Sequence, residues 1–437
     1  MQKTFSIKTL GCKLNQYESS LIAGQFIENG WVGRPFGEKV DAVIINTCTV
    51  TNRSDKKCKN YIRQGAAFSN KGKVLVTGCM GERDADYLKN MPEVFTVVKN
   101  SEKEKIFSVV NSGTYLVSIG NEINEINGIN EIQDNITILK KNEFPLPFYR
   151  TRGLVKIQDG CDGECSYCIV PYVRGKPVSR NFKEVLDHAY RLIDSGCPEL
   201  ILTGITIGKY LSNDKNLAKL IDELVNIDGK FRVRITSIEP NHISDDLIEC
   251  FSFDKVCSHI HVPLQSGSDR ILKLMKRRYS VNEYIKIIDR IRKKNNDISI
   301  GTDVIIGFPE ESEDDFLLSM KTIEDIGFSY VHQFTFSKRS GTQASLMNGC
   351  SNKEISERSS RMRELANSLA FNYRKRFLGM YLPSIIEKNK SRDGYKAVSS
   401  NYIKMDIKNI LSEDDKIGII TDVRLEALEI ERAIGVL

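Results

Sequence analysis

Three cysteines lie close together in the segment GCDGECSYCIVPYVRG, as Cys161, Cys165 and Cys168. Thiolates at this C-x3-C-x2-C spacing suit a metal ion or an iron–sulfur cluster, and Gly160 and Gly163 free the backbone to bend around such a group. Structural zinc normally takes four closed ligands, and the segment holds no fourth cysteine or histidine. On a four-iron cluster, three cysteines leave one iron open to a small molecule. A zinc site completed from elsewhere in the chain is the alternative interpretation.

Three more cysteines, Cys12, Cys48 and Cys79, occur in the segments TLGC, INTC and VTGC, each at or just after the end of a predicted strand. The carboxyl ends of parallel strands meet at one edge of a sheet, so these thiols can converge on a second three-thiolate site. From spacing alone, three small buried apolar side chains explain them equally well. The remaining cysteines are expected to be packing or surface residues: Cys58, Cys197, Cys250, Cys257 and Cys350.

The elements that must position these cysteines follow an alternation of short apolar strands and helical patterns. Over residues 1–110, strands predicted at 4–9, 42–46, 73–77 and 94–98 alternate with helices at 15–28, 55–68 and 82–90. This alternation is typical of an α/β fold with a parallel sheet covered by helices. The stretch 120–135, rich in Asn, Glu and Ile, is interpreted as an exposed insertion or linker.

Strand–helix units resume between residues 153 and 337. Strands are predicted at 154–158, 199–203, 232–236, 258–263, 299–306 and 330–336. Six such units favour an open six-stranded (βα)6 barrel with its chemistry at the carboxyl ends of the strands. A basic helix is predicted at 354–378, and short strands at 384–387, 404–407 and 416–423 indicate a small β-barrel. The predicted segments are therefore 1–119, 120–146 (linker), 147–378 and 379–437.

The composition is that of an ordinary globular chain. A net charge of +6 over 437 residues permits a nucleic-acid partner without demanding one. The chain has no apolar run of membrane-spanning length and no apolar N-terminal signal segment, so we expect a cytoplasmic enzyme with no membrane partner. Eleven cysteines, an odd number in a long chain, argue against a disulfide scaffold.

The three-cysteine segment, directly after the strand that opens a βα barrel, resembles the radical S-adenosylmethionine (SAM) superfamily. Together with TLGCKLNQYES, INTCTVTNRSD and VTGC, it resembles the radical-SAM methylthiotransferase family over essentially the whole chain, including a C-terminal barrel similar to an RNA-binding TRAM domain. The resemblance implies two [4Fe–4S] clusters. One is implied on Cys161, Cys165 and Cys168, with SAM on its open iron, and an auxiliary one on Cys12, Cys48 and Cys79.

The resemblance also implies the chemistry. One electron from the first cluster would cleave SAM, and the resulting 5′-deoxyadenosyl radical would remove hydrogen from C2 of an adenine. The auxiliary cluster would hold sulfur that a second SAM methylates, and would deliver the methylthio group to C2. That C–H bond is one that no acid–base pair can ionise, so we nominate no acid–base catalytic residue. The implied SAM-binding residues lie beside the last cysteine and at barrel strand ends: Tyr167, Gly204, Ser237, Glu239, Gln265 and Asp303. Ordinary turn chemistry at strand ends is the alternative for each of them.

The sequence assigns no functional role to the histidines. His259 and His261 alternate on one predicted strand and so face the same side, but histidines lining a barrel are more often packed and hydrogen-bonded than metal ligands. His188, His242 and His332 show no motif.

The wording KLNQYE after the first cysteine, and NTCTVTNRSD, resembles the bacterial branch that modifies threonylcarbamoyladenosine next to the tRNA anticodon. The alternative substrates are isopentenyladenosine in tRNA and an aspartate of a ribosomal protein. The alternative from another class of function is a non-catalytic RNA-binding factor that holds zinc. Two departures are Phe336, where the family often has Tyr, and the 120–135 stretch.

The expected partners are tRNA and an electron donor of flavodoxin or ferredoxin type, and we expect a monomer. Candidate RNA contacts are the basic helix at 354–378, the loop around Arg174 and Arg180, stacking faces on Tyr395 and Tyr402, and the cations Lys273, Lys276, Arg277 and Arg278 beside Tyr279. The tail itself has about as many acidic as basic residues, which is less basic than an RNA-gripping barrel is expected to be.

Overall fold

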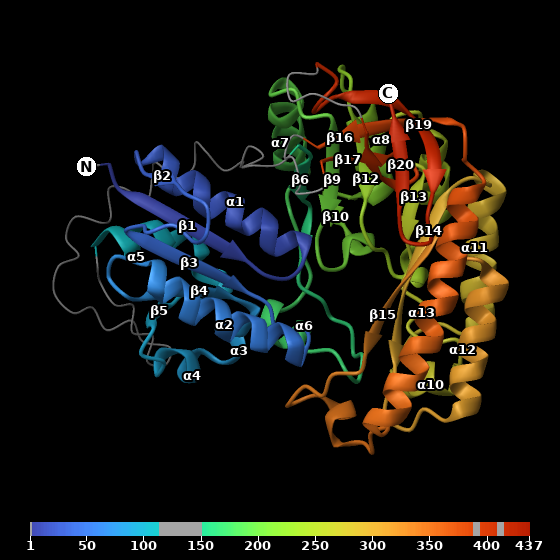
Figure 1. Cartoon of the computed structure of the whole chain (residues 1–437), viewed down its shortest axis with the longest axis horizontal. Helices are drawn as coiled ribbons and strands as arrows, with labels where there is room; N and C mark the ends of the chain where they lie inside the picture. The colour runs from blue at the N-terminus through green and yellow to red at the C-terminus, as the bar shows by residue number, and fades with distance from the viewer. Residues whose placement is uncertain (1, 113–150, 388–393, 409–414) are drawn as a thin grey trace. The chain divides into compact units, whose positions relative to one another are not determined.

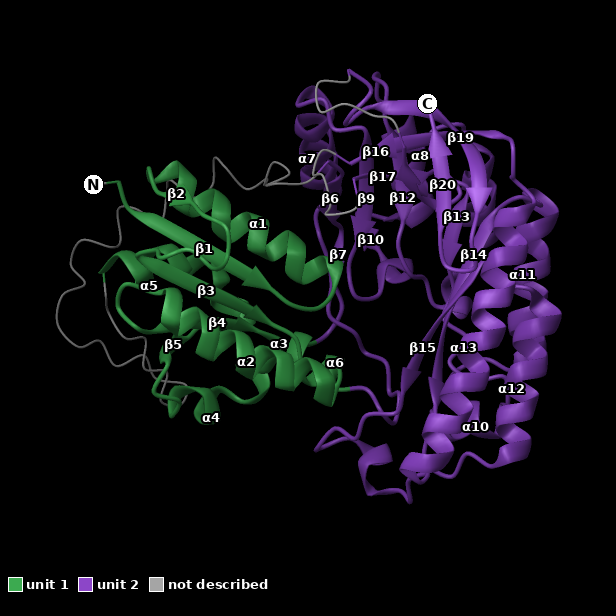
Figure 2. Cartoon of the chain, viewed as in Figure 1, with its two compact units in different colours: residues 1–148, 169–175 green, residues 149–168, 176–437 purple. Residues whose placement is uncertain are grey.

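The computed structural model describes residues 2–112, 151–387, 394–408 and 415–437. The chain forms two compact units, residues 1–148 with 169–175, and residues 149–168 with 176–437 (Figure 2). The predicted insertion at 120–135 lies outside the described residues, and the predicted four-segment boundaries stay a prediction. Among the described residues, no helix combines the length and the apolar character that crossing a membrane requires.

The first unit is built on a parallel five-stranded sheet with the order β2-β1-β3-β4-β5 (Figure 1). Four of these strands were predicted from the sequence, and β2 was not, because two residues carry no periodic pattern. The strands are β1 Thr4–Thr9, β2 Val32–Gly33, β3 Ala42–Thr47, β4 Val74–Gly78 and β5 Val94–Val97.

Helices cover both faces of this sheet because side chains alternate along each strand. On β3, Val43 and Ile45 pack into the core under α2, whereas Ala42 and Ile44 pack into the core under α1 and α5. The helices of this unit are α1 Lys13–Glu28, α2 Asn52–Phe68, α3 Cys79–Arg83, α4 Ala85–Lys89, the 3-10 helix η1 Asn100–Lys105, α5 Ile106–Ser112 and α6 Val170–Arg174.

The second unit contains six parallel strands that form the predicted open barrel, called the half-barrel below. Two three-stranded sheets, β6-β9-β12 and β13-β14-β15, are joined by the parallel bridges Val233↔Val256 and Ser237↔His261. The strands are β6 Gly153–Lys156, β9 Glu199–Thr203, β12 Arg232–Ile235, β13 His259–His261, β14 Ser299–Ile306 and β15 Tyr330–Thr335. Helices α7 Phe182–Asp194, α8 Leu217–Val225, α11 Val281–Lys294 and α12 Glu313–Ile326 bury their apolar faces against them.

Shorter elements connect these strands. They are β7 Gln158–Asp159, β8 Val178–Ser179, η3 Ile207–Lys209, β10 Leu211–Ser212, β11 Lys215–Asn216, η4 Pro240–His242, α9 Asp245–Glu249, η5 Cys250–Ser252, α10 Asp269–Leu274 and η6 Gln343–Leu346. The predicted basic helix is α13, which runs from Asn352 to Lys375. The hydroxyl of its cap residue Ser351 accepts a hydrogen bond from the Glu354 backbone N–H, and the Ser351 backbone N–H donates one to the Glu354 carboxylate. These two bonds fix where the helix begins.

The tail forms the predicted closed barrel, here called the C-terminal barrel, in the order β16-β17-β18-β20-β19 with a core of its own. The strands are β16 Tyr381–Ile386, β17 Tyr395–Ser399, β18 Lys404–Ile407, β19 Ile420–Leu428 and β20 Ala433–Val436. Strands β17 and β20 were not predicted, and Gly435 weakens the pattern of β20. The glycine is needed there, since a Cβ at that position would lie 2.6 Å from Cγ1 of Val423.

A buried ion cluster joins the C-terminal barrel to the half-barrel within the second unit. The fully buried Glu199 accepts hydrogen bonds from Nε of Arg232 at 2.7 Å and Nε of Arg234 at 2.8 Å. The same two guanidinium groups donate to the backbone carbonyls of Pro383, Val398, Ser399 and Ser400. The carboxylate therefore holds two arginines in position to satisfy carbonyls of the C-terminal barrel.

Replacing Glu199 with glutamine is expected to destabilise the fold by about 3–5 kcal/mol, because two buried guanidinium groups lose their counter-charge. Burial raises the pKa of Glu199, but Arg234 and Arg232 outweigh it and hold the pKa well below the usual value. The carboxylate thus stabilises the fold above the ordinary glutamate pKa, and this stabilisation is lost as the pH falls further. Denaturant unfolding at pH 7 measures the effect. Asp222→Asn, which breaks an exposed pair with Lys219, is the control and should leave stability unchanged. Equal stability of both variants would contradict the role of Glu199 in the buried ion cluster.

Candidate functional site

The three-cysteine loop, residues 160–168, begins where β7 ends and is anchored there by Gln158. The buried side-chain amide of Gln158 donates to the Gly160 carbonyl at 2.8 Å, and its Oε1 accepts from the Thr206 backbone N–H at 2.6 Å. A Cβ at Gly204 would lie 2.6 Å from the Gln158 carbonyl oxygen, so the absence of a side chain at Gly204 serves this packing. The ends of two adjacent strands thus fix the start of the loop.

The other end of the loop is held by Ser166. Its backbone N–H donates to the Met275 carbonyl at 3.1 Å and its hydroxyl to the Leu274 carbonyl at 2.7 Å. Its own carbonyl accepts from the Ala344 N–H at 2.8 Å. The loop is therefore tied to the end of α10 and to η6, and the three cysteines between these anchors lie on a fixed backbone.

The thiols of this loop meet hydrogen-bond donors. The Gly163 N–H donates to Sγ of Cys161 at 3.2 Å, and Nη1 of Arg277 donates to Sγ of Cys165 at 3.2 Å. A Cβ at Gly163 would lie 3.1 Å and 3.8 Å from the same two sulfur atoms, so the glycine leaves room for both. Cys161, Cys165 and Cys168 are all partly exposed. Donors aimed at partly exposed sulfurs are the arrangement that stabilises thiolate ligands of an iron–sulfur cluster.

Arg277, which the sequence grouped with Lys273, Lys276 and Arg278 as a candidate RNA contact, is a residue of this site. Its side chain is 5% exposed, pairs with the Glu239 carboxylate, and donates from Nε to the Tyr279 hydroxyl at 3.1 Å. Burial raises the pKa of the Cys165 thiol, and the Arg277 charge acts in the opposite direction. Arg277 therefore supplies a permanent positive charge beside a cluster-type thiol, and it links that thiol to Glu239.

The other residues expected to bind SAM lie at several strand ends of the half-barrel. Tyr167 packs edge-on against Phe308, with ring centroids 6.2 Å apart, and burial raises its pKa well above the usual value. Ser237 is exposed just after β12, and Gln265 takes a left-handed conformation with φ of +68°. Asp303 instead lies within 3.5 Å of the side chains of His261 and His332.

In the first unit, two glycines allow the ends of β1, β3 and β4 to meet. A Cβ at Gly11, which has φ of +101°, would lie 2.8 Å from Cβ and 3.1 Å from Sγ of Cys48. A Cβ at Gly78, with φ of +93°, would lie 2.3 Å from the Thr47 carbonyl oxygen. Cys12 directly follows Gly11, and Cys79 directly follows Gly78. The three N-terminal cysteines thus come from three adjacent strand ends packed at glycine contacts.

A buried polar network lies against this second group of thiols. Nε of Arg174 donates to Sγ of Cys79 at 3.4 Å, and its two Nη atoms donate to Glu18 and Asn15. Lys103 also pairs with Glu18. Burial raises the pKa of Glu18, but Lys103 and Arg174 outweigh it and hold the pKa at about 2, so the carboxylate stays charged. Burial raises the pKa of Cys79 to about 11, with Arg174 opposing it.

The expectation that the loop around Arg174 contacts RNA is wrong for Arg174 itself. Its side chain is 2% exposed because Glu18 and Asn15 enclose the guanidinium, so its charge is not available to a phosphate. The local pattern could not reveal this, since Arg174 lies 95 residues after Cys79 in the chain.

Cys58 packs against the backbone of Cys48. Its sulfur accepts from the Cys48 N–H at 3.4 Å and its thiol donates to the Cys48 carbonyl at 3.3 Å, and burial raises its pKa to about 12. It is fully buried in the core under α2. Cys197, Cys250 and Cys257 are also buried, and Cys350 is partly exposed. These five are the cysteines expected to pack or to lie at the surface.

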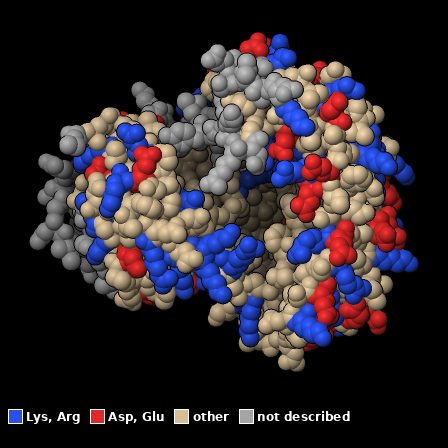
Figure 3. All heavy atoms as spheres, in the orientation of Figure 1, with Lys and Arg blue, Asp and Glu red and all other residues tan. Residues whose placement is uncertain are grey.

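The other candidate RNA contacts are mostly occupied within the second unit. On α13, Arg358 pairs with Glu311 and Glu313 and is 4% exposed, and Arg361 pairs with Glu313 at 2.5 Å. Tyr395 is 6% exposed, and the Tyr402 ring lies 4.3 Å from the His259 ring, so neither offers a free stacking face. On the side of Figure 3 where α11 and α12 lie, basic and acidic side chains are interspersed rather than gathered in one basic patch.

Two family models match the chain. Residues 155–323 match the radical SAM superfamily, and residues 4–99 match a family described as uncharacterized protein family UPF0004. The first runs from within β6 to within α12 and so covers most of the half-barrel with the three-cysteine loop, and the second covers the sheet that bears the N-terminal cysteines.

The chain is also similar to curated proteins over nearly its whole length. It is 35% identical to the threonylcarbamoyladenosine tRNA methylthiotransferase MtaB of Bacillus subtilis (strain 168), over 97% of this chain and 93% of that protein. It is 30% identical to a tRNA-2-methylthio-N(6)-dimethylallyladenosine synthase of Acetivibrio thermocellus, over 98% and 89%. Among solved structures, a radical SAM methyltransferase, TsrM from Kitasatospora setae, superposes with a TM-score of 0.54 at 12% identity, over 79% of this chain and 77% of that one, a likeness of fold alone.

Proposed function

Since the chain belongs to the radical-SAM tRNA methylthiotransferases, we propose that it transfers a methylthio group to C2 of N6-threonylcarbamoyladenosine next to the tRNA anticodon. Family membership brings SAM and a [4Fe–4S] cluster with it. The observation that carries the proposal is the presence of two separate groups of three cysteines, each at carboxyl ends of parallel strands.

Cys161, Cys165 and Cys168 would hold the cluster that binds SAM. When bound, the two cofactors supply one-electron chemistry that activates a C–H bond which no acid or base can ionise. The chain's own residues have defined tasks around them. Gly163 and Arg277 donate to the sulfur ligands. Glu239, which pairs with Arg277, would receive polar groups of SAM together with Ser237 and Gln265. Tyr167 offers its ring to the adenine.

Cys12, Cys48 and Cys79 would hold the auxiliary cluster, which supplies the sulfur that is transferred. The support is the contact of Gly11 with Cys48 and the hydrogen bond from Arg174 to Cys79. Because burial gives Cys79 a high pKa, its thiol is protonated in the free protein, and iron must displace that proton on binding. The buried Arg174 charge favours the resulting thiolate.

The choice of threonylcarbamoyladenosine rests on two features. The relative that carries this substrate in its name is 35% identical over 97% of the chain, and the wording GCKLNQYES and NTCTVTNRSD favours the same branch. We further propose that the enzyme acts in the cytoplasm as a monomer, with a flavodoxin- or ferredoxin-type electron donor.

Anaerobic assays with reconstituted enzyme, SAM and dithionite test the substrate. We expect methylthiolation of tRNA that bears threonylcarbamoyladenosine, and at least about ten-fold less with tRNA that bears only isopentenyladenosine. Equal or reversed rates would contradict the substrate choice. Metal analysis of the purified protein tests the other class of function, since iron with sulfide supports the enzyme and zinc alone would support an RNA-binding factor.

Arg174→Ala is expected to weaken the auxiliary cluster, because Cys79 loses its buried donor and counter-charge. Removing such a partner typically costs about 10–100-fold in metal affinity, so iron should fall from about eight toward about four atoms per chain. Arg174→Lys keeps the charge and one donor and should retain more iron than the alanine variant. Iron analysis after gel filtration measures both. Full iron content in Arg174→Ala would show that the arginine does not support the cluster.

A further inference from the structure

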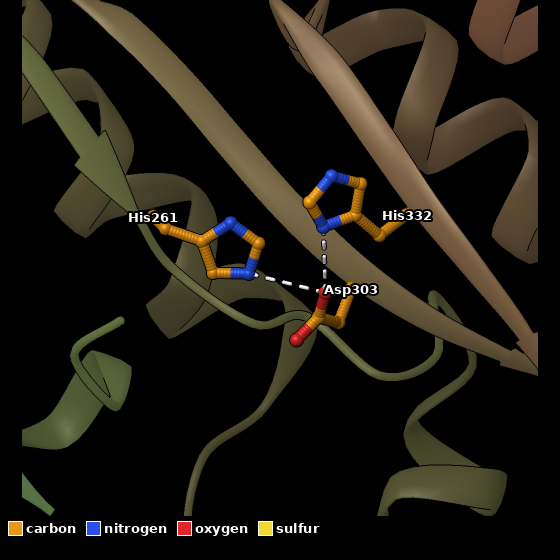
Figure 4. Close-up of side chains that lie close together, drawn as sticks. All are labelled: His261, Asp303 and His332. Atoms are coloured by element: carbon orange, nitrogen blue, oxygen red, sulfur yellow. Dashed lines mark ion pairs between the residues drawn. The ribbon is translucent and has the colours of Figure 1, made fainter. Parts of the chain in front are cut away.

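Three side chains of metal-binding types meet in the half-barrel, and none of them is one of the six proposed cluster cysteines. His261 extends from β13, Asp303 from β14 and His332 from β15, and one ligand atom from each lies within 4.8 Å of the others (Figure 4). The strand register explains the meeting, since β14 lies between the other two strands and Asp303 is paired directly with His332. We call these residues the His–Asp–His cluster.

The distances in this cluster match those between ligands of a metal ion. Oδ1 of Asp303 lies 3.2 Å from Nε2 of His261 and 3.5 Å from Nδ1 of His332. Charge-assisted N–H···O bonds are shorter, about 2.7–2.9 Å. Two ligands bound at about 2.0–2.1 Å to one divalent ion lie about 3.0 Å apart in octahedral and about 3.4 Å apart in tetrahedral geometry. Both observed N···O distances are therefore closer to the distance between two ligand atoms of one metal ion than to the length of a strong hydrogen bond.

A second group of contacts orients His261. Its Nδ1 lies 3.2 Å from the Tyr330 hydroxyl, which is 2.8 Å from Nε2 of His259. Tyr330 is confined by Gly301, where a Cβ would lie 1.9 Å from its ring. If Nδ1–H of His261 donates to Tyr330 and Tyr330 donates to His259, the lone pair on Nε2 of His261 faces the Asp303 carboxylate. A cation between these two groups satisfies both, and the tyrosine is the outer partner that metal-binding histidines usually have.

The cluster is open on one side. The side chains of His261 and Asp303 are 7% and 26% exposed, whereas that of His332 is 53% exposed. The site thus offers one carboxylate and two imidazole side chains, and an ion can reach it through the exposed side.

We propose that His261, Asp303 and His332 together bind one divalent transition-metal ion. Two histidines and one carboxylate hold such ions with coordination positions left open, which here would accept water or an oxygen of a small ligand. The site goes beyond the proposed function and does not depend on either cluster. It also gives Asp303 a role different from the SAM contact expected from the sequence.

A titration with Mn²⁺ tests the site, using holoenzyme under anaerobic conditions and the signal of free Mn²⁺ in electron paramagnetic resonance. Mn²⁺ is a suitable probe because it prefers oxygen and imidazole ligands over thiolates, so the cysteines compete poorly. We expect about one Mn²⁺ per chain, with affinity lowered at least about ten-fold in His332→Ala and in Asp303→Asn. His242→Ala, which removes a histidine of the same unit from outside the cluster, is the control and should bind as wild type does.

Two results would overturn the proposal: wild-type enzyme that binds no stoichiometric Mn²⁺, or His332→Ala that binds it as tightly as wild type. His332 is exposed, so its alanine variant should melt at the wild-type temperature, which separates loss of a ligand from loss of the fold. Iron content is measured in the same samples. Loss of Mn²⁺ binding with unchanged iron would be specific to the His–Asp–His cluster, whereas failure of the cluster assignments would appear in the iron content alone.

Discussion

Cys165→Ala is expected to abolish SAM cleavage. Cys165 is the loop cysteine that Arg277 contacts, and without its thiolate the three-ligand set has only Cys161 and Cys168. A cluster held by two cysteines is poorly retained, and the Arg277 charge is left without its sulfur partner. We expect 5′-deoxyadenosine formation, with dithionite as the reductant, to fall at least about 1,000-fold, which corresponds to about 4 kcal/mol of lost transition-state stabilisation.

Cys350→Ala is the matched control for this experiment. Cys350 is also partly exposed and lies in the same unit, and its thiol contacts the carbonyls of Phe308 and Glu311 and the side chain of Arg358. We expect this variant to cleave SAM at the wild-type rate. SAM cleavage by Cys165→Ala at more than a few per cent of wild type would mean that the three-cysteine loop does not hold the cluster.

Cys48→Ala is expected to separate the two proposed clusters. The variant should form 5′-deoxyadenosine within about two-fold of wild type, because Cys48 belongs to the first unit and the three-cysteine loop to the second. Methylthiolated tRNA should fall at least about 100-fold, because the auxiliary cluster loses a ligand and with it the transferable sulfur. Mass spectrometry of nucleosides from the reaction measures the product, and high-performance liquid chromatography measures 5′-deoxyadenosine.

Cys58→Ala controls for the loss of a buried thiol in the same region. Cys58 contacts the backbone of Cys48 in the core under α2, so its replacement costs packing but no proposed iron ligand. We expect it to retain both activities. Product formation by Cys48→Ala would contradict the assignment of the auxiliary cluster, and so would a loss of product in Cys58→Ala as large as that in Cys48→Ala.

Most strands and helices of the fold were predictable because each carries its own periodic pattern. Strand β14 is an example, since its eight residues are nearly all buried and were predicted with the bounds Ser299–Ile306. The single helix predicted at 82–90 is instead two, α3 and α4, because Asp84 takes a non-helical conformation, with φ of −115° and ψ of 31°. Its carboxylate binds the Arg83 side chain, a local polar interaction that competes with helix continuation.

In the candidate site, too, the residues in local sequence motifs were predictable and those brought together by the fold were not. The six cysteines could be proposed from the sequence because each lies in a short local motif at a strand end. Arg277 and Arg174 could not, since they lie 112 and 95 residues from the sulfur atoms they contact. His332 carried no motif either, and its relation to His261 and Asp303 follows only from the parallel register of β13, β14 and β15. Long-range pairing of this kind is set by the fold and leaves no local pattern.

The proposed activity of this enzyme is methylthiolation of threonylcarbamoyladenosine in tRNA. The most direct test is nucleoside mass spectrometry of tRNA from cells with the gene, cells without it, and deletion cells that carry the Cys165→Ala gene. We expect that 2-methylthio-N6-threonylcarbamoyladenosine is lost in the deletion and in the Cys165→Ala cells, and that N6-threonylcarbamoyladenosine accumulates in both. Unchanged levels of the methylthiolated nucleoside in cells that lack the gene and any second such enzyme would contradict the proposed substrate.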